Sequence, residues 1–587
     1  MKWQIGNLRP LFRLAAPLPK ASIFGPMGSR AVAIIVTALC LGNAGAQPLN
    51  HGGGFTHADT LRGSNGPYRA WWDVTHYDIA VTPDYATKSI QGTTTISFSA
   101  VDRGQRLQID LQQPLAIHSV SLAWASGTAD LHYQRDGNVA WVDLPREMRS
   151  GDHAALRINY GGVPREARNP PWDGGWVWAR DPDGNPWMSV ACQGLGASVW
   201  YPCKDIQSDE PDSAALHITA PDSLQAVGNG RLRSTVANGN GTSTWNWAVV
   251  NPINNYDIAP SIGKYGHIHD TYPGLNGPLD MDYWVLKGNE DKAREHFAEV
   301  PQMLACFEDW FGPYPFYKDG YKLVEDPFLG MEHQSAIAYG NNFRMGYAGR
   351  DLSATGWGLK WDYIIIHESA HEWWGNSITS ADIADMWVHE AFADYAEALY
   401  TECRFGKAAG EDYVIGLRRL IANDIPIIGA YGVNQEGSTD MYYKGANMLN
   451  TVRHIMANDS LFKAMLRGLH QRFRHTVVSG ADVERFISGF SGRDFSKLFD
   501  QYLRTTQIPE LQWTVKGGKL WTRFTNCVPG LSMPVPITVN GEERTVAIGT
   551  QWSNPAHGLN KRTATLTADR NWYMEVKRVG KAALRVR

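Results

Sequence analysis

Residues 367–395 have the sequence HESAHEWWGNSITSADIADMWVHEAFADY, the pattern of a metal-binding helix followed by a second helix. In a helix, residues four apart project from the same face, so His367 and His371 can offer their imidazoles to one ion. Glu368 lies one step round, where it can reach a water on that ion without binding the ion itself. Zinc held by two imidazoles needs a third protein ligand and keeps one position open. The stretch therefore predicts a catalytic zinc site, with a polar face on a core helix as the alternative.

The third ligand is expected from the second helix. Glu390 follows His371 by nineteen residues, within a segment whose apolar residues recur at helical spacing. An antiparallel helix at that distance can return its carboxylate to the same ion, which predicts one zinc per chain held by His367, His371 and Glu390. Asp394, one turn further, is a candidate to accept the free N–H of a ligand histidine. The alternative for Asp394 is an acid that faces solvent.

These elements, taken in order, resemble the gluzincin zinc aminopeptidases, the family of aminopeptidase N and leukotriene hydrolase. GMEH at 330–333 is similar to the family's GxMEN motif, and MYYKG at 441–445 matches its Tyr-x-Lys-Gly element. CQGLGASVWYPCKD at 192–205 resembles the segment by which the family's β-domain reaches the active site. The resemblance extends from about residue 70 to residue 510.

The resemblance implies a role for each matching residue. Glu368 acts as general base and then general acid, and the Tyr442 hydroxyl stabilises the oxyanion of the transition state. The free amino end of a peptide is held by a group of substrate-binding residues: Glu332, Gln193, Gly330 and Met331. Two positions depart from the family pattern. His333 replaces the usual asparagine and is expected to pack or hydrogen-bond, and the neutral Gln193 should hold an ammonium more weakly than glutamate.

Alternating apolar and polar residues from Trp71 to about Gly266, helical periodicity from about Asn289 to about Thr505 and alternation again after Pro509 predict a multidomain α+β fold, as the resemblance also implies. We expect an N-terminal antiparallel β-domain over 67–266, a thermolysin-like and mostly α-helical catalytic domain over 267–508, and a small C-terminal β-sandwich-like domain over 509–587. Residues 47–66 are polar and glycine-rich, which is typical of a flexible lead-in. The sequence ends after the third domain, without the large helical C-terminal domain of longer members, so a more open cleft is expected.

The first 46 residues have the pattern of a signal peptide. Five basic residues and no acid accompany an apolar run from Ala31 to Leu41, and Ala44-Gly45-Ala46 forms a small-residue cleavage site. The run is too short to span a bilayer, so no stable membrane anchor is expected. Cleavage would take the formal net charge from −4 to −9, which disfavours nucleic-acid binding. We therefore expect an exported protein, either periplasmic or secreted.

Five cysteines follow the predicted signal peptide, too few for a disulfide-rich scaffold. Cys192 and Cys203 lie eleven residues apart and could pair after export, or remain as buried free thiols.

The sequence thus predicts a zinc-dependent aminopeptidase acting on peptides with a free N-terminus. Two alternatives keep the same site but change the reaction, namely a zinc endopeptidase and an epoxide hydrolase. A third is a catalytically inactive exported binding protein, in which the tryptophan-rich PWDGGWVWAR at 171–180 would offer aromatic faces to a ligand.

Overall fold

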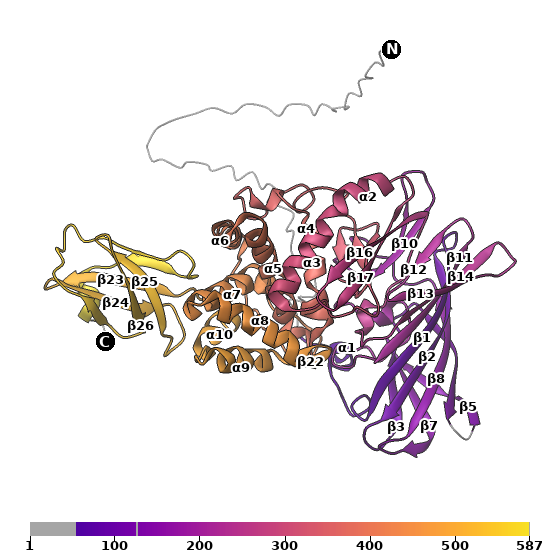
Figure 1. Cartoon of the computed structure of the whole chain (residues 1–587). Coiled ribbons are helices and arrows are strands. Elements are labelled where there is room, and N and C mark those ends of the chain that lie inside the picture. Colours follow the sequence, from indigo (N-terminus) through magenta and orange to yellow (C-terminus); the bar gives the residue numbers. More distant parts are fainter. Residues whose placement is uncertain (1–53, 125–126, 586–587) are drawn as a thin grey trace, which may run out of the picture. The chain divides into compact units, whose positions relative to one another are not determined.

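The computed structural model describes residues 54–124 and 127–585 of the 587-residue chain. The predicted signal peptide over 1–46 lies outside these residues. Colours in Figure 1 follow the sequence, from the N-terminal strands in indigo and magenta to the C-terminal strands in yellow.

The N-terminal domain consists of strands that alternate between a buried and an accessible face. In β1, Tyr77, Ile79 and Val81 are buried while the residues between them are half-buried, as expected when one face of a strand meets the core. The largest sheet has eight strands in the order β13-β14-β11-β1-β2-β8-β4-β5. They are β1 (Trp72–Asp84), β2 (Ser89–Ala100), β4 (Ala116–Trp124), β5 (Gly127–Leu131), β8 (His153–Gly162), β11 (Ser213–Pro221), β13 (Arg231–Ala237) and β14 (Thr242–Val249).

Two smaller sheets complete this domain. One has the order β3-β7-β6 and the other β12-β15-β10-β9. Their strands are β3 (Gly104–Asp110), β6 (Tyr133–Asp136), β7 (Val139–Met148), β9 (Gly175–Arg180), β10 (Pro186–Ala191), β12 (Gln225–Val227) and β15 (Ser261–Gly263).

The segment before these strands is partly helical, which differs from the expected flexible lead-in. Helix α1 (His57–Gly63) begins with a capping box, in which the Thr56 side chain and Asp59 satisfy each other's backbone N–H groups. The Leu61 carbonyl accepts a hydrogen bond of 2.8 Å from the Gln108 side chain in β3. The glycine-rich composition therefore did not predict this short helix, which is hydrogen-bonded to the β-domain.

The catalytic domain combines a five-stranded sheet with most of the helices. The sheet has the order β16-β17-β18-β20-β19, and its first strand begins two residues before the expected boundary at 267. Its strands are β16 (Tyr265–Gly274), β17 (Gly277–Leu286), β18 (Tyr321–Glu325), β19 (Gly330–Met331) and β20 (Ile337–Tyr339). The helices are α2 (Glu290–His296), α3 (Val300–Phe311), α4 (Tyr363–Ala370), α5 (Trp387–Phe405), α6 (Lys407–Gly416), α7 (Tyr443–Met456), α8 (Asp459–Phe473), α9 (Gly480–Ser491) and α10 (Ser496–Leu503). A two-stranded ladder joins β21 (Ile378–Ser380) to β22 (Thr476–Val478).

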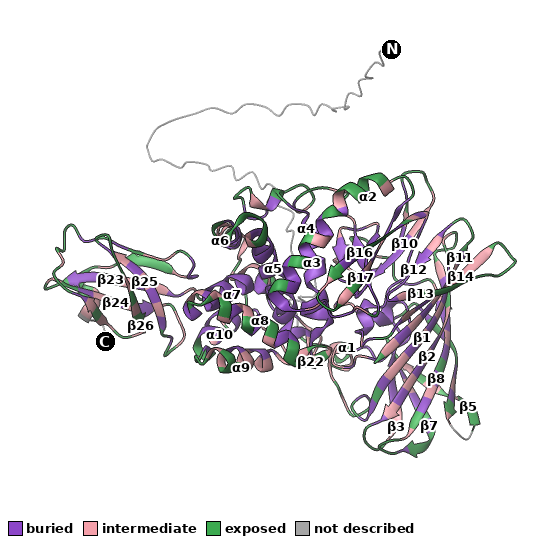
Figure 2. Cartoon of the chain, in the orientation of Figure 1, coloured by how far each residue is buried: buried purple, intermediate pink, exposed green. Residues whose placement is uncertain are grey.

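Helices α4 and α5 lie in the core of this domain. The Asp362 carboxylate caps α4 by accepting from the N–H groups of Ile364 and Ile365, and every residue of α4 is buried. In α5 an unbroken run from Trp387 to Thr401 is buried, and Figure 2 colours this helix purple along most of its length. A helix buried on all faces depends on its neighbours for position, so both helices form a rigid base for polar side chains.

The C-terminal domain contains two sheets that share apolar residues in one hydrophobic cluster. Their orders are β27-β24-β23-β29 and β26-β25-β28. Leu511 and Val515 from the first sheet and Val535 and Ile537 from the second belong to that cluster, which continues into the catalytic domain; the expected C-terminal β-domain is thus confirmed as a region of β-sheets. The strands are β23 (Glu510–Lys516), β24 (Lys519–Thr525), β25 (Met533–Val539), β26 (Glu542–Ile548), β27 (Ser553–Ala556), β28 (Leu566–Ala568) and β29 (Glu575–Arg578).

The disulfide of the described chain is not the pair that the sequence left open. Cys306 in α3 and Cys403 in α5 are bonded, whereas Cys192 and Cys203 are buried free thiols. The two bonded cysteines are 97 residues apart, so no local sequence pattern marks them as a pair. The bond ties α3 to the C-terminal part of α5, the helix that also carries Glu390.

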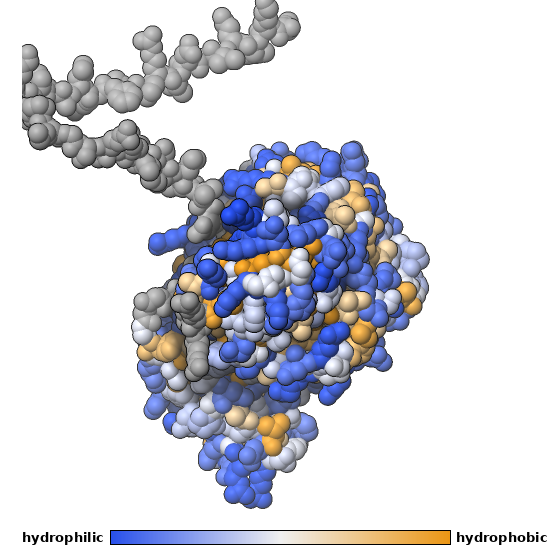
Figure 3. All heavy atoms as spheres, turned by 90° about the vertical axis from the view of Figure 1, so that its left-hand side faces the viewer, coloured by the Kyte–Doolittle hydropathy of each residue, from blue (hydrophilic) through white to orange (hydrophobic). Residues whose placement is uncertain are grey.

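Hydrophilic residues dominate the face of the molecule in Figure 3, and apolar residues appear there in small groups. Such scattered groups are ordinary on protein surfaces. Among the described helices, none combines the length and the apolar character that a membrane crossing requires.

Candidate metal centre and active site

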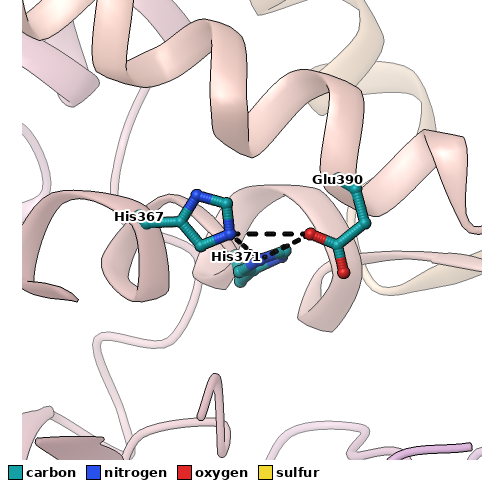
Figure 4. A group of neighbouring side chains, drawn as sticks. All are labelled: His367, His371 and Glu390. Atoms are coloured by element: carbon teal, nitrogen blue, oxygen red, sulfur yellow. Dashed lines mark hydrogen bonds and ion pairs between the residues drawn. The ribbon is translucent and has the colours of Figure 1, made fainter. Parts of the chain in front are cut away.

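His367, His371 and Glu390 converge on one point between α4 and α5 (Figure 4). The Nε2 atoms of the two histidines are 3.3 Å apart. Glu390 Oε2 lies 3.5 Å from Nε2 of His367 and 3.4 Å from Nε2 of His371. All three side chains are buried.

This triangle of donor atoms fits a tetrahedral zinc ion. Ligand bonds of about 2.0–2.1 Å in a tetrahedron place neighbouring donor atoms about 3.3–3.4 Å apart, which the three sides match closely. Glu390 Oε2 is buried and has no hydrogen-bond partner among the described residues, as expected of an oxygen that binds a cation. Two imidazoles and one carboxylate leave the fourth position for water or substrate, the arrangement of catalytic zinc.

Glu397, rather than Asp394, orients a ligand histidine. The second ring nitrogen of His367, Nδ1, lies 2.7 Å from Glu397 Oε1, and the Tyr413 hydroxyl donates to Glu397 Oε2 at 2.6 Å. Asp394 is fully buried, and neither of its oxygens has a hydrogen-bond partner in the described chain. Both expectations for Asp394, histidine acceptor and solvent-facing acid, are therefore wrong.

The second ligand histidine is oriented by the backbone. Nδ1 of His371 lies 2.9 Å from the carbonyl oxygen of Trp374. That carbonyl is available because the helical path is broken at Trp374 and Gly375, whose backbone angles are non-helical, with φ of +130° at Gly375. An Nδ1 proton donated to an oxygen leaves Nε2 as the donor atom toward a metal, so both histidines are held in the ligating tautomer.

Replacing Glu397 by glutamine is expected to weaken zinc binding about tenfold or more, because the charged acceptor that orients His367 is lost. Asp394→Asn is the matched control from the same helix. Burial, and then repulsion from Glu397, raises the pKa of Asp394 well above its usual range, so asparagine resembles its protonated form. Competition with a chromophoric chelator measures both affinities. Equal losses in the two variants would contradict the assignment of Glu397.

Glu368 lies beside the three ligands and close to the backbone at Gly330, where there is no room for a side chain. One of its carboxylate oxygens, one of Glu332 and a ring nitrogen of His371 all lie within 4.8 Å of one another. A Cβ atom at Gly330 would lie 2.7 Å from Glu368 Oε1, so any side chain there would displace the carboxylate. Burial raises the pKa of Glu368 to about 7, which suits a group that takes up and returns a proton near neutral pH.

Glu332 and Gln193 meet across the boundary between the β-domain and the catalytic domain. The Gln193 side-chain amide donates to Glu332 Oε1, and the Tyr256 hydroxyl donates to the same oxygen at 3.2 Å. Asn376 holds the Glu332 backbone through a 2.8 Å hydrogen bond to its carbonyl. Burial raises the pKa of Glu332, and a cationic group against it would favour the charged form.

Met331 and His333 lie on either side of Glu332 in the sequence, and both are buried. Met331 lies in an apolar cluster with Val177 and Ala191 of the β-domain and with Phe328. His333 is buried, its Nε2 has no hydrogen-bond partner among the described residues, and burial lowers its pKa to about 3. A neutral, buried imidazole fits the expectation that His333 packs in the interior.

Tyr442, at the N-terminal end of α7, lies beside the metal ligands, as does Tyr363, whose ring stacks on His367 at 5.1 Å from centroid to centroid. The ring of Tyr442 lies 6.0 Å from that of His367, centroid to centroid. Burial, and then the negative charges of Glu390 and other acids, raise the pKa of Tyr442 well above 10, so the phenol keeps its proton. Burial and the charges of Asp394 and Glu397 raise the pKa of Tyr443, so its hydroxyl lies near those two acids.

Glu397 and Tyr256 are the site residues that sequence reasoning missed. Glu397 follows Glu390 by seven residues, two turns along the same helix face, so helical spacing offered a signal for it. Tyr256 lies outside every motif, and only the fold brings it to Glu332. Within the tryptophan-rich segment, Trp176 and Trp178 offer no face to a ligand, since they are 0% and 8% exposed and stack on each other, whereas Trp172 is half-buried.

Comparison with protein families identifies both of the larger domains. Residues 296–502 match the peptidase family M1 domain, and residues 74–256 match the peptidase M1 N-terminal domain. Human (Homo sapiens) aminopeptidase B is 23% identical over 372 residues, which are 60% of this chain and 52% of that protein. Leukotriene A-4 hydrolase from Xenopus laevis is 20% identical over 75% of this chain and 73% of its own length.

Other relatives differ in length from this chain. Puromycin-sensitive aminopeptidase from Caenorhabditis elegans is 21% identical over 75% of this chain but only 47% of that protein. The chain thus spans about half the length of the first curated relatives it matches. A solved M1 zinc metallopeptidase from Deinococcus radiodurans, a mutant bound to a Tyr-Ser-Ala substrate, matches with a TM-score of 0.63 at 22% identity. The match covers 76% of this chain and 98% of that one, so the two share a fold.

Proposed function

This chain belongs to the M1 peptidase family of gluzincin zinc metallopeptidases, and from that membership we propose that it is an aminopeptidase. It would hydrolyse the first peptide bond of peptides that have a free amino end. The curated relatives named aminopeptidase B and puromycin-sensitive aminopeptidase support this class of reaction.

The position of Glu332 is the observation that carries the proposal. Its carboxylate lies within 4.8 Å of both Glu368 and His371, so an ammonium held by Glu332 is close to the point of bond cleavage. The α-ammonium and the carbonyl of the first residue are separated by a single Cα atom, so a substrate whose ammonium binds Glu332 presents the carbonyl of that same residue to Glu368. A peptide extending further toward its N-terminus would place uncharged chain against a buried carboxylate, which is unfavourable.

His367, His371 and Glu390 would hold the zinc ion. When bound, zinc polarises the scissile carbonyl and lowers the pKa of a water molecule. Glu368 is placed to take the proton of the attacking water and to deliver it to the departing amine. Glu397 and the Trp374 carbonyl keep the two imidazoles in the orientation that this arrangement requires.

Tyr442 supplies the remaining hydrogen bond of the mechanism. As the carbonyl carbon becomes tetrahedral, negative charge develops on its oxygen, and a protonated phenol aimed at that oxygen stabilises it. Glu332, with Gln193 beside it, holds the amino group of the substrate through charge-assisted hydrogen bonds. The two ends of the first residue are thus held while Glu368 carries the proton from the attacking water to the departing amine.

We also propose that the protein is exported to the periplasm or beyond the cell. The basic and apolar pattern of residues 1–46 supports this, as does the disulfide between Cys306 and Cys403, since disulfides persist in oxidising compartments.

Mass spectrometry of the products from one decapeptide, sampled over time, tests the reaction class. An aminopeptidase releases single residues in order from the N-terminus, whereas an endopeptidase releases internal fragments. Release of fragments from the start would overturn the proposal in favour of the endopeptidase. Hydrolysis of an epoxide substrate with no peptide cleavage would favour the epoxide hydrolase, and inactivity with bound zinc would favour a binding protein.

A further inference from the structure

Gln193 lies in a tight turn whose shape decides where its side chain points. The Leu195 N–H donates to the Gln193 carbonyl at 2.7 Å, and the Gly196 N–H donates to the Cys192 carbonyl at 2.6 Å. Gly194 and Gly196 have φ of +68° and +100°, values that favour glycine. A turn with two such residues has little side-chain packing of its own, so its position depends on contacts from outside.

Those contacts come from three segments that are far apart in the sequence. The Gly194 carbonyl accepts hydrogen bonds from the Arg62 guanidinium in α1 and from the Asn434 amide, the latter at 3.0 Å. The next carbonyl, of Leu195, accepts from the Gln112 amide at 2.7 Å. The turn therefore has one donor from the N-terminal segment, one from the β-domain and one from the catalytic domain.

The half-buried Arg62 reaches the turn beside three buried charged residues, Arg69, Asp110 and Asp205. A Cβ atom at Gly196 would lie 2.1 Å from Asp205 Oδ2 and 2.6 Å from Arg62 Nη2, so the two side chains close over this glycine. Arg62 Nε is itself buried and has no hydrogen-bond partner among the described residues. The Asp205 carboxylate accepts a hydrogen bond from the Ser198 hydroxyl, and the Asp205 backbone N–H donates to Asp110 Oδ2 at 3.0 Å. A guanidinium in such surroundings is directional and strongly held.

The backbone that carries Arg62 is held as firmly as the side chain. Arg69 is fully buried, pairs with Asp110, and donates to the carbonyl of Arg62 at 2.7 Å and to that of Ser64 at 3.1 Å. At the other end, a Cβ atom at Gly63 would lie 2.0 Å from the backbone nitrogen of Asn434. The N-terminal segment thus lies directly against the loop that supplies the second donor to Gly194.

We propose that Arg62 is a positioning residue for recognition of the substrate's amino group. It holds the carbonyl of Gly194 so that the preceding residue, Gln193, meets Glu332 across the domain boundary. The segment around α1, where composition predicted only a flexible lead-in, would then be part of the amine-binding apparatus. This inference rests on the proposed aminopeptidase function.

The expected effect lies in substrate binding. Removing a hydrogen bond to a charged donor lets the turn shift, and the ammonium then loses the same interaction in the ground state and in the transition state. Arg62→Ala should therefore raise KM for a free aminoacyl substrate about tenfold and leave kcat within about twofold.

A double-mutant cycle with Gln193→Ala separates this role from general damage to the fold. If Arg62 acts through Gln193, adding Arg62→Ala to Gln193→Ala should change KM by less than about twofold. Arg474→Ala is the matched control, because Arg474 also donates to a main-chain carbonyl, that of Pro315, and burial also lowers its pKa. It should leave KM unchanged.

Each outcome bears on the inference. An unchanged KM in a folded Arg62→Ala protein would overturn it, and so would an equal rise of KM with and without Gln193. If Arg62→Ala does not fold, Asn434→Ala removes the other donor to the Gly194 carbonyl. The same cycle with Gln193→Ala then tests whether donors to this carbonyl act on KM through Gln193. Failure of the proposed function itself would appear separately, as wild-type enzyme that cleaves free and N-acetylated substrates equally.

Discussion

Glu368→Gln is expected to lower kcat by about 10³-fold or more, with zinc content unchanged. Glutamine has nearly the same shape as glutamate, so it should fit in the narrow space beside Gly330. A Cβ atom built at Gly330 would lie only 2.7 Å from the Glu368 carboxylate. It cannot accept the proton of the attacking water or return it to the leaving amine. Since His367, His371 and Glu390 remain intact, the metal site should persist while the reaction stops. Steady-state kinetics and metal analysis on the same preparation measure both quantities.

Glu372→Gln is the control for this variant. Glu372 lies one turn beyond Glu368, is fully buried, and accepts from the Ser335 N–H at 2.7 Å and the Tyr314 hydroxyl at 3.1 Å. Burial raises its pKa to about 8, so near neutral pH glutamine resembles its protonated form. This variant should keep kcat within about threefold, as expected for a residue outside the chemistry. A fully active Glu368→Gln protein would exclude Glu368 as the base.

Tyr442→Phe is expected to lower kcat by about 10²- to 10³-fold and to leave KM nearly unchanged, because its hydroxyl stabilises charge that exists only in the transition state. The phenylalanine ring should keep the position beside His367, where the ring centroids are 6.0 Å apart. The loss would therefore report the hydroxyl alone. Initial rates over a range of substrate concentrations separate kcat from KM.

Tyr443→Phe provides the comparison, since the two tyrosines are adjacent and the Tyr-x-Lys-Gly spacing favours only the first. Tyr443 lies toward Asp394 and Glu397, so its hydroxyl should contribute little to the reaction. A larger loss of kcat in Tyr443→Phe than in Tyr442→Phe would reverse the assignment.

The metal ligands could be predicted because they depend on local geometry. Helical spacing places His367 and His371 on one face, and a second helix with an acid at the right distance completes the set. The family resemblance added Glu332 and Tyr442, which lie in other segments. The fold class could be predicted for a similar reason, since the spacing of apolar residues within each segment indicates whether it forms a strand or a helix.

Other features depend on long-range packing and left little local signal. Asp394 and Glu397 both lie on α5, and only the packing of α4 against it decides that Glu397 meets His367 at 2.7 Å. The Cys306–Cys403 bond joins residues 97 apart, and neither lies in a pattern that marks a pair. Helix α1 was missed because glycine and polar residues dominate its surroundings, while its position depends on buried contacts of Arg62 and Arg69.

The ratio of kcat/KM for a peptide with a free amino end to that for its N-acetylated form measures amino-end recognition directly. Acetylation removes the positive charge that Glu332 would bind and leaves the scissile bond in place. We expect the ratio to exceed about 10² in the wild-type enzyme, as for the loss of a buried charge-assisted contact. It should fall sharply in Glu332→Gln. Equal cleavage of the two peptides by the wild-type enzyme would contradict the aminopeptidase function and leave a zinc endopeptidase in its place.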